Sequence, residues 1–245
     1  MLIPLQDILK KYEIEPKGII HVGAHWAEEH EDYLKCGIES FVYIEPCKDA
    51  FKIMLDKFSP KAKYPDGRDV EPIVHHTKDN HVGYYINDGK DEATGRYKLR
   101  SHSFFNLACG SEEGEMPMYV SHQNQGQSNS LLEPKLHLRQ HPEVVFDDAE
   151  AVKVVRLDNL PIEKEKYDML AMDVQGFEGE VLKGATETLK HIKLIYTEVN
   201  RGQTYSGNME IEEIDSLLGV QGFKRVETFW PSPNWTWGDA IYIKI

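Results

Sequence analysis

The chain has 245 residues, a length that suits one sizeable α/β domain, and its 40% hydrophobic and 28% charged residues are typical of a globular protein. Its 28 basic and 41 acidic residues give a net charge of −13, which disfavours a nucleic-acid partner and favours a neutral or cationic small-molecule acceptor. No apolar run is long enough for a signal peptide or a membrane span, and the three cysteines match no zinc pattern, so we expect a soluble, cytoplasmic protein without a membrane partner.

Helical and strand-like patterns alternate in the first quarter of the chain. Leucines at helical spacing predict an amphipathic helix over 2–12. A buried strand at 18–24 and a helix at 26–36 follow, and then a strand at 40–45 and a helix at 48–58. This alternation is typical of a parallel sheet with right-handed crossovers.

The alternation breaks at residues 59–102, which hold several prolines and glycines and few large apolar side chains. We therefore expect an insertion or lid at 59–102 within a single domain that spans 1–245. The elements predicted after it are strands at 103–108, 115–120, 152–157 and 167–173, a helix at 178–190, a strand at 192–199, a helix at 210–221, and strands at 223–229 and 239–245. The last two strands have no crossover helix between them and should pair antiparallel. The pattern predicts an α/β fold with a mostly parallel sheet that ends in an antiparallel hairpin and carries helices on both faces.

The ends of the first two strands suggest a nucleoside-binding edge. Gly23 would let a ligand approach the backbone, and Glu45, about 20 residues later, can bind both ribose hydroxyls of an adenosine. The later glycines of a dinucleotide fingerprint are replaced by His25 and Glu28, and Glu28 would repel a diphosphate. A sulfonium cofactor carries no phosphate, so these residues favour S-adenosylmethionine over NAD. A tight turn followed by a surface acid is the alternative interpretation.

Residues 173–185 read Asp-Val-Gln-Gly-Phe-Glu-Gly-Glu-Val-Leu-Lys-Gly-Ala, and this segment resembles the central motif of the FkbM-type methyltransferases. The resemblance extends over about 18–245, apart from 59–102. Other segments follow in the family's order: Val22-Gly23-Ala24-His25, Glu45-Pro46, Asn106-Leu107-Ala108, Ser128-Asn129-Ser130, Tyr196-Thr197-Glu198-Val199-Asn200 and Trp237-Gly238-Asp239-Ala240. The resemblance implies a Rossmann-like methyltransferase fold with a seven-stranded sheet, and S-adenosylmethionine as the cofactor.

The resemblance also implies a cofactor site. By analogy, Gly23 lies behind the methionine part of the cofactor, Glu45 binds the ribose and Asn106 lies near the adenine. Two positions depart from the family pattern: Ala27 replaces a glycine, and Gln175 replaces a glutamate, which keeps hydrogen bonding but cannot act as a base. The full set of implied cofactor-binding residues is Val22, Gly23, Ala24, His25, Glu45, Pro46, Asn106, Leu107 and Ala108.

Asp173 and Glu198 are the candidate catalytic residues, because they stand where the fourth and fifth parallel strands should end, facing the cofactor sulfur. Asp173 can act as the general base for an acceptor hydroxyl. Two alternatives stay open: with Asn200 these acids can hold Mg²⁺, or they are helix caps and hydrogen-bond partners of nearby loops. We favour a site without metal. Ser128, Ser130 and Gln175 are candidates for contacts with the substrate, although a plain turn explains the two serines equally well.

For two groups of side chains we prefer a structural or solvent-exposed role over a role in binding. The histidines have no companion cysteine or H-E-x-x-H motif, so we interpret them as solvated loop residues: His75, His76, His81, His137 and His141. Three tryptophans, Trp230, Trp235 and Trp237, can form a wall that stacks on a sugar, but packing at the sheet edge is the preferred interpretation.

The leading hypothesis is therefore an S-adenosylmethionine-dependent O-methyltransferase that acts on a small-molecule sugar or a glycan-like acceptor. The acceptor class rests on the family resemblance alone. Methylation of a non-sugar metabolite or of a protein is the alternative among enzymes. Gln175 and Ala27 also keep open a catalytically inactive, cofactor-binding interaction module.

Overall fold

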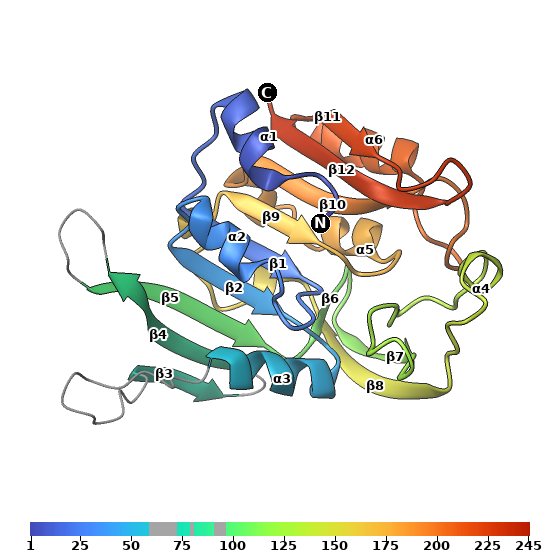
Figure 1. The fold of residues 1–245 in the computed structure, drawn as a ribbon, viewed down its shortest axis with the longest axis horizontal. Helices are drawn as coiled ribbons and strands as arrows, with labels where there is room; N and C mark the ends of the chain where they lie inside the picture. The colour runs from blue at the N-terminus through green and yellow to red at the C-terminus, as the bar shows by residue number, and fades with distance from the viewer. Residues whose placement is uncertain (59–72, 79–80, 91–96) are drawn as a thin grey trace.

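The computed structural model describes residues 1–58, 73–78, 81–90 and 97–245, and Figure 1 shows helices on both faces of a large sheet. The helices are α1 (Leu5–Tyr12), α2 (His30–Lys35), α3 (Lys48–Phe58), α4 (His137–Gln140), α5 (Glu178–Lys183) and α6 (Ile211–Val220). The strands are β1 (Gly18–Val22), β2 (Ser40–Ile44), β3 (Ile73–Lys78), β4 (His81–Lys90), β5 (Tyr97–Phe105), β6 (Ala108–Cys109), β7 (Gly114–Val120), β8 (Asp148–Val155), β9 (Met169–Met172), β10 (Leu194–Asn200), β11 (Phe223–Phe229) and β12 (Trp237–Lys244). Within these ranges, no helix has the length and apolar character needed to cross a membrane.

The main sheet has nine strands in the order β11-β12-β10-β9-β1-β2-β5-β4-β3. Strands β5, β2, β1, β9 and β10 pair in parallel, whereas β12 pairs antiparallel with both β10 and β11. The predicted fold class is confirmed, because the seven strands from β11 to β5 form a mostly parallel sheet that ends in an antiparallel hairpin. The two further strands, β3 and β4, extend this sheet by antiparallel pairing on β5.

The range predicted as an insertion or lid, 59–102, contributes strands to the main sheet. Strands β3 and β4 and the first part of β5 lie in this range, and Ser101 of β5 pairs in parallel register with Ser40 of β2. Residues 59–72, 79–80 and 91–96 of the range lie outside the described residues, so its role as a lid stays a prediction. The sequence indicates only short strand-like pieces such as 82–86, which lies within β4, because histidines, glycine and charged residues interrupt the apolar alternation, as is common near a sheet edge.

The central strands are buried on both faces. All five residues of β1 are buried, which explains why the run shows no apolar–polar alternation. Ile19 packs in the cluster that contains side chains of α1, α2 and α3, and its neighbour Ile20 packs in the cluster with α5 and α6. The helices therefore cover both faces as predicted, and they hold the carboxyl ends of the strands in a rigid row.

A second sheet, β6-β8-β7, packs against the α5 side of the core. Residues 121–147, which we call the covering segment, lead from β7 to β8 and include the short helix α4. Figure 1 shows the small sheet and this segment on the side of the main sheet toward which β1, β2 and β9 point. The sequence predicts strands at 115–120 and 152–157, but only tertiary packing places them and the polar covering segment at this edge.

The turn after β1 is a loop rather than the start of the helix predicted at 26–36, since α2 begins only at His30. A Cβ on Gly23 would lie 1.9 Å from the carbonyl oxygen of Asp173, so only glycine allows this approach between the ends of β1 and β9. Positive φ angles occur in this loop at Gly23 (77°), His25 (47°) and Ala27 (52°).

Candidate active site

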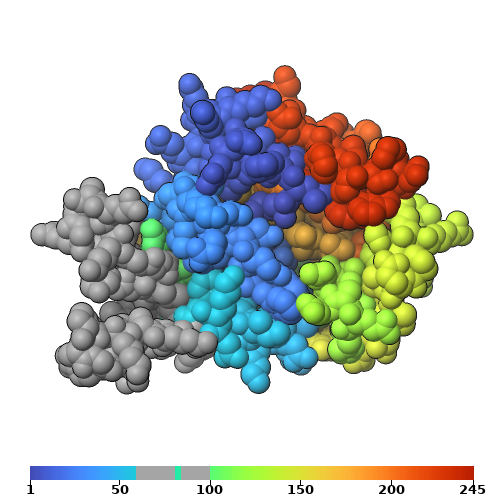
Figure 2. Space-filling view, in the orientation of Figure 1, coloured from blue at the N-terminus to red at the C-terminus, as the bar shows by residue number. Residues whose placement is uncertain are grey.

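A cavity of about 670 Å³ lies at the carboxyl ends of β1, β2, β9 and β10, under the covering segment. Figure 2 shows a hollow between blue N-terminal residues, red C-terminal residues and the yellow-green covering segment. Ligands bind at this edge of open α/β sheets, and the volume is in the range of small-molecule sites. The predicted site residues that line it are Val22, Gly23, Ala24, His25, Glu45, Pro46, Ala108, Ser128, Asp173, Gln175 and Glu198.

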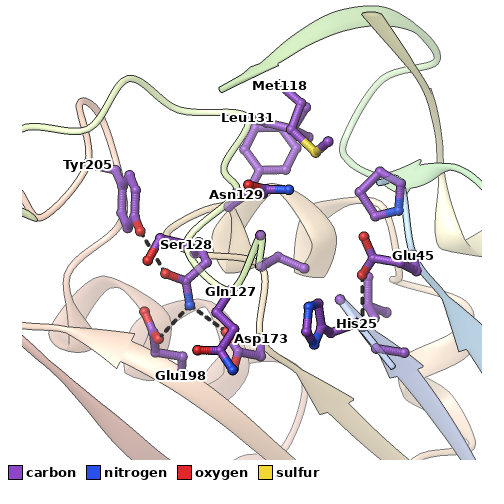
Figure 3. Close-up of a pocket in the computed structure, with 18 of the residues that line it drawn as sticks. His25, Glu45, Met118, Gln127, Ser128, Asn129, Leu131, Asp173, Glu198 and Tyr205 are labelled. Carbon is purple, nitrogen blue, oxygen red and sulfur yellow. Dashed lines mark hydrogen bonds between the residues drawn. The ribbon is translucent and has the colours of Figure 1, made fainter. Parts of the chain in front are cut away.

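Glu45 is buried at the tip of β2, and both of its carboxylate oxygens accept hydrogen bonds from backbone N–H groups. Oε2 accepts from His25 at 2.8 Å (Figure 3), and Oε1 accepts from Cys47 at 2.8 Å. Burial raises the pKa of Glu45 to about 7, although the two N–H donors and the nearby His25 favour the ionised form. Each oxygen keeps a free lone pair, so the carboxylate can still accept two hydroxyl groups from a ribose.

Asn106 and Leu107 do not line the cavity, although the resemblance implied that they bind the cofactor. The amide of Asn106 donates to the carbonyl oxygens of Glu45, at 2.9 Å, and Pro46, at 3.1 Å. Leu107 is 4% exposed and belongs to the core. Asn106 therefore shapes the loop that carries Glu45 instead of facing the ligand.

An apolar wall forms one side of the cavity, and Figure 3 shows Met118 and Leu131 together on it. Ala108, Cys109 and Phe177 also belong to the lining. Such a surface suits a flat heteroaromatic ring like adenine. Sequence reasoning missed Met118 and Leu131, because they come from β7 and the covering segment, whose position depends on the second sheet.

On another side of the cavity, one amide joins two carboxylates. The Nε2 of Gln175 donates to Oδ1 of Asp173, at 2.7 Å, and to Oε2 of Glu198, at 3.2 Å (Figure 3). The hydroxyl of Tyr205 donates to Oε1 of Gln175, at 2.6 Å, and fixes the orientation of the amide. Ser130 does not line the cavity; its hydroxyl donates to the backbone carbonyl of Gln175, at 2.7 Å. We call Asp173, Gln175 and Glu198 the carboxylate bridge.

The two acids of the carboxylate bridge differ in their surroundings. Asp173 borders the open cavity. Loss of hydration beside the surrounding protein raises its pKa to about 6, and the negative charges of Asp239 and Glu29 add to this rise. Glu198 is 6% exposed, and burial followed by repulsion from Asp173 and Glu178 raises its pKa well above the usual range. Asp173 is therefore the acid that is ionised at neutral pH, and the concentration of acids favours a cationic ligand beside it.

Of the three residues of the magnesium alternative, Asp173 and Glu198 line the cavity. In the part of the chain that the structure describes, no group of three or more histidines, cysteines and acids is arranged to hold a metal ion. Asn200 is 1% exposed and is not part of the cavity lining, and its amide lies 3.5 Å from Oε1 of Glu198.

His25 ties the loop after β1 to the covering segment. Its Nδ1 lies 2.7 Å from Oε1 of Glu28, and its Nε2 lies 2.9 Å from the carbonyl oxygen of Gln125. Both partners are acceptors, so both contacts are satisfied only by the protonated imidazolium. Burial opposes the proton, but the hydrogen bonds to Glu28 and Gln125 outweigh it and raise the pKa of His25.

The interpretation of the histidines as solvated loop residues is wrong for His137 and His81. His137 is 5% exposed and lines the cavity, and His81 stacks on Phe105 with ring centroids 4.1 Å apart. The side chains of His75 and His76 lie outside the described residues. His141 also lines the cavity and accepts a hydrogen bond from Nε1 of Trp237 at 3.3 Å.

The three tryptophans divide between the cavity and the surface around it. Trp237 lines the cavity and stacks on Trp235, with ring centroids 5.2 Å apart. Trp230 instead packs under the guanidinium of Arg201, 4.4 Å from its ring centroid. One tryptophan therefore faces the cavity, a second stacks on it, and the third packs against Arg201.

A protein-family model and a bacterial relative match parts of the chain. The family model described as "Methyltransferase FkbM domain" matches residues 21–225. The 2-O-methyltransferase NoeI of Sinorhizobium fredii (strain NBRC 101917 / NGR234) is 36% identical over 116 residues, which are 46% of this chain and 46% of that protein. The match thus spans about half the length of that relative.

Solved methyltransferase structures resemble the chain more distantly. Magnesium protoporphyrin IX methyltransferase from Synechocystis PCC 6803 with bound SAM has 8% identity and a TM-score of 0.48, and the alignment covers 98% of this chain and 76% of that one. A putative S-adenosylmethionine-dependent methyltransferase from Listeria monocytogenes has 8% identity and a TM-score of 0.48, with 98% and 97% covered. At this low similarity, neither structure bears on the substrate.

Proposed function

The chain belongs to the FkbM methyltransferase family, and on this premise we propose that it methylates a hydroxyl oxygen of a sugar or glycan-like acceptor. The family resemblance of the sequence is confirmed by the match over residues 21–225, and the cofactor is S-adenosylmethionine. The acceptor and the methylated atom are the proposed part.

The residues around the cavity fit this cofactor. Gly23 lines the cavity where the ends of β1 and β9 approach each other closely, and Glu45 offers two carboxylate oxygens to a ribose. Asn129 lines the cavity, and its amide nitrogen is buried without a hydrogen-bond partner among the described residues, so it can donate to an acceptor atom of a ligand. Met118 and Leu131 supply the apolar surface for adenine.

When bound, S-adenosylmethionine supplies an electrophilic methyl group with the positive charge of a sulfonium. Asp173 borders the cavity and is mostly ionised at neutral pH, so its carboxylate can accept the proton of an acceptor hydroxyl. Gln175 holds Oδ1 of Asp173 at 2.7 Å and restricts its orientation. The carboxylate bridge beside an open cavity is the observation that carries the proposal.

The acceptor class is supported by three features. The relative NoeI bears the name of a 2-O-methyltransferase. Around the cavity, Trp237 offers an aromatic face, while Asn124 and Gln127 offer polar groups, a combination that suits a polyhydroxylated ring. The net charge of −13 disfavours polyanionic acceptors such as nucleic acids.

The test is methyl transfer from S-adenosylmethionine with a ¹³C-labelled methyl group to a panel of methyl hexopyranosides, catechols and peptides. We expect a new methyl ether on a hexopyranoside, detected by NMR, and its formation at a rate about 10²–10⁴ lower with the Asp173→Asn variant. Transfer only to catechols or peptides would favour the alternative among enzymes. Cofactor binding without transfer to any acceptor would favour an inactive interaction module.

A further inference from the structure

His137 is buried in the covering segment, yet one nitrogen of its ring lacks a partner. The residue is 5% exposed and lines the cavity. Its Nε2 lies 3.2 Å from the hydroxyl oxygen of Ser128, while Nδ1 is buried without a hydrogen-bond partner among the described residues. Burial lowers the pKa of His137 to about 4, so the ring is neutral. A buried polar atom of this kind is costly unless a ligand pairs with it.

Asn124 adds a second atom of the same kind. Its amide nitrogen donates to the hydroxyl of Ser128, at 2.7 Å, so Ser128 joins Asn124 to His137. The carbonyl oxygen of the Asn124 side chain is buried and has no hydrogen-bond partner in the described part of the chain, although the residue lines the cavity. Two residues of one hydrogen-bonded cluster thus line the cavity, and each has one buried polar atom without a partner among the described residues.

The chemistry of these two atoms selects the group that they can bind. The oxygen of Asn124 only accepts, so the ligand must bring a donor. Nδ1 of His137 accepts or donates, depending on the tautomer that Ser128 selects. A hydroxyl group both donates and accepts and therefore satisfies either tautomer. A carboxylate or phosphate brings no donor, and neither neutral side chain compensates its charge.

This cluster lies next to the carboxylate bridge. The ring of His137 is 5.5 Å from the ring of Tyr205, and the hydroxyl of Tyr205 donates to Gln175, whose amide holds Asp173. Figure 3 shows Ser128 on the same side of the cavity as Tyr205. An acceptor with one hydroxyl at Asp173 can therefore extend along Tyr205 toward His137.

We propose that Asn124, Ser128 and His137 form a subsite for a second hydroxyl group of the acceptor, distinct from the one that is methylated. The acceptor is then a polyol such as a sugar ring, and not a simple alcohol. This inference rests on the proposed function for the place of the reacting hydroxyl, but its binding contacts are independent of catalysis.

The experiment compares the binding of methyl hexopyranosides and their monodeoxy analogues to protein saturated with S-adenosylhomocysteine, by saturation-transfer difference NMR. His137→Phe keeps an aromatic ring but removes both nitrogens, and Asn124→Leu removes the acceptor oxygen. His122→Ala is the matched control, because His122 lies in the same segment, pairs with Asp147 at the surface and does not line the cavity. Calorimetry with S-adenosylhomocysteine checks that each variant keeps the fold of the cavity.

We expect one deoxy analogue to bind the wild-type protein about two- to tenfold more weakly than its parent, the scale of one lost hydrogen bond. Both cavity variants should bind the parent more weakly and lose this discrimination, while His122→Ala keeps it. A loss of discrimination that the control does not share separates a direct contact from a structural effect.

Three results decide between the inference and the proposed function. If discrimination by the wild type persists in both cavity variants, the inference is overturned and the proposed function stands. If the hexopyranosides bind with the expected discrimination but are never methylated, the subsite stands and the proposed function fails. If the wild-type protein binds none of the hexopyranosides, both are overturned.

Discussion

Replacing Glu45 by glutamine separates its role in cofactor binding from its role in folding. Glutamine has one acceptor oxygen, whereas Glu45 uses one oxygen for His25 N–H and the other for Cys47 N–H, each at 2.8 Å. The variant therefore leaves one backbone N–H facing an NH₂ group, and it offers a ribose only one acceptor oxygen. Two opposing effects on the apoprotein follow.

The loss of one partner for a buried N–H destabilises the fold by about 1–3 kcal/mol. The substitution also stabilises the fold, because it removes a carboxylate that is costly to bury. The pKa of Glu45 is raised from an ordinary value of 4.5 to about 7, and this rise corresponds to about 3 kcal/mol against the ionised form. The two terms nearly cancel, so we expect little change in apoprotein stability at pH 8. Affinity for S-adenosylmethionine should still fall by about 1.5–3 kcal/mol, because a charge-assisted hydrogen bond is lost.

The pH dependence of stability gives an independent check. Because the folded-state pKa of Glu45 is raised, its contribution to stability is present below pH 4.5 and is lost as the pH rises through about 7. Thermal unfolding of the apoprotein should therefore favour the wild type over Glu45→Gln more at pH 5 than at pH 8. The glutamine variant lacks this titration.

The assay combines calorimetry with S-adenosylmethionine and thermal unfolding of the apoprotein. Asp158→Asn is the matched control, because Asp158 accepts N–H groups of Glu187 and Thr188 and does not line the cavity. It should lower stability and leave cofactor affinity unchanged. Unchanged affinity in Glu45→Gln would refute the assignment of Glu45 to the cofactor, and a loss of stability matching the loss of affinity would make it a structural cap.

Four further outcomes are expected at the carboxylate bridge. Asp173→Asn should lower turnover by about 10²–10⁴ with cofactor affinity retained, as for a lost base, and full activity in steady-state assays would leave Asp173 a structural residue. Gln175→Glu places a third carboxyl 2.7 Å and 3.2 Å from the other two, and at an effective dielectric constant of about 20 each pair repels by about 5 kcal/mol. This repulsion favours proton uptake, so the acid limb of the pH–rate profile should move to higher pH. An unchanged profile would contradict this expectation. S-adenosylmethionine should lose affinity faster than the neutral S-adenosylhomocysteine as the pH falls from 7 to 6, because protonation of Glu45 and Asp173 removes charge that favours the sulfonium; parallel losses in calorimetry would count against it. EDTA should leave turnover unchanged, whereas a loss that Mg²⁺ restores would make Asp173 and Glu198 metal ligands.

The order of the central elements and the cofactor edge follow from the sequence alone, because both depend on local patterns. Apolar runs such as 18–22 reveal strands buried on both faces, and helical spacing reveals the crossovers between them. In a parallel sheet the carboxyl ends of the strands meet at one edge. The sequence alone therefore places Gly23, Glu45, Asp173 and Glu198 together. The family motif at 173–185 is recognised from the order of its residues, without knowledge of the fold.

The tertiary structure decided which side chains face the ligand and how they are held. Gln175, whose backbone has a positive φ of 52°, bridges two acids with an amide that Tyr205 from another loop holds. His137 is a cavity residue, and Asn106 is not, because of where distant segments pack. These contacts join residues far apart in the chain, and neither periodicity nor spacing reports on them. A side chain's role in the site is set by the partners around it, and those partners assemble only when the fold forms.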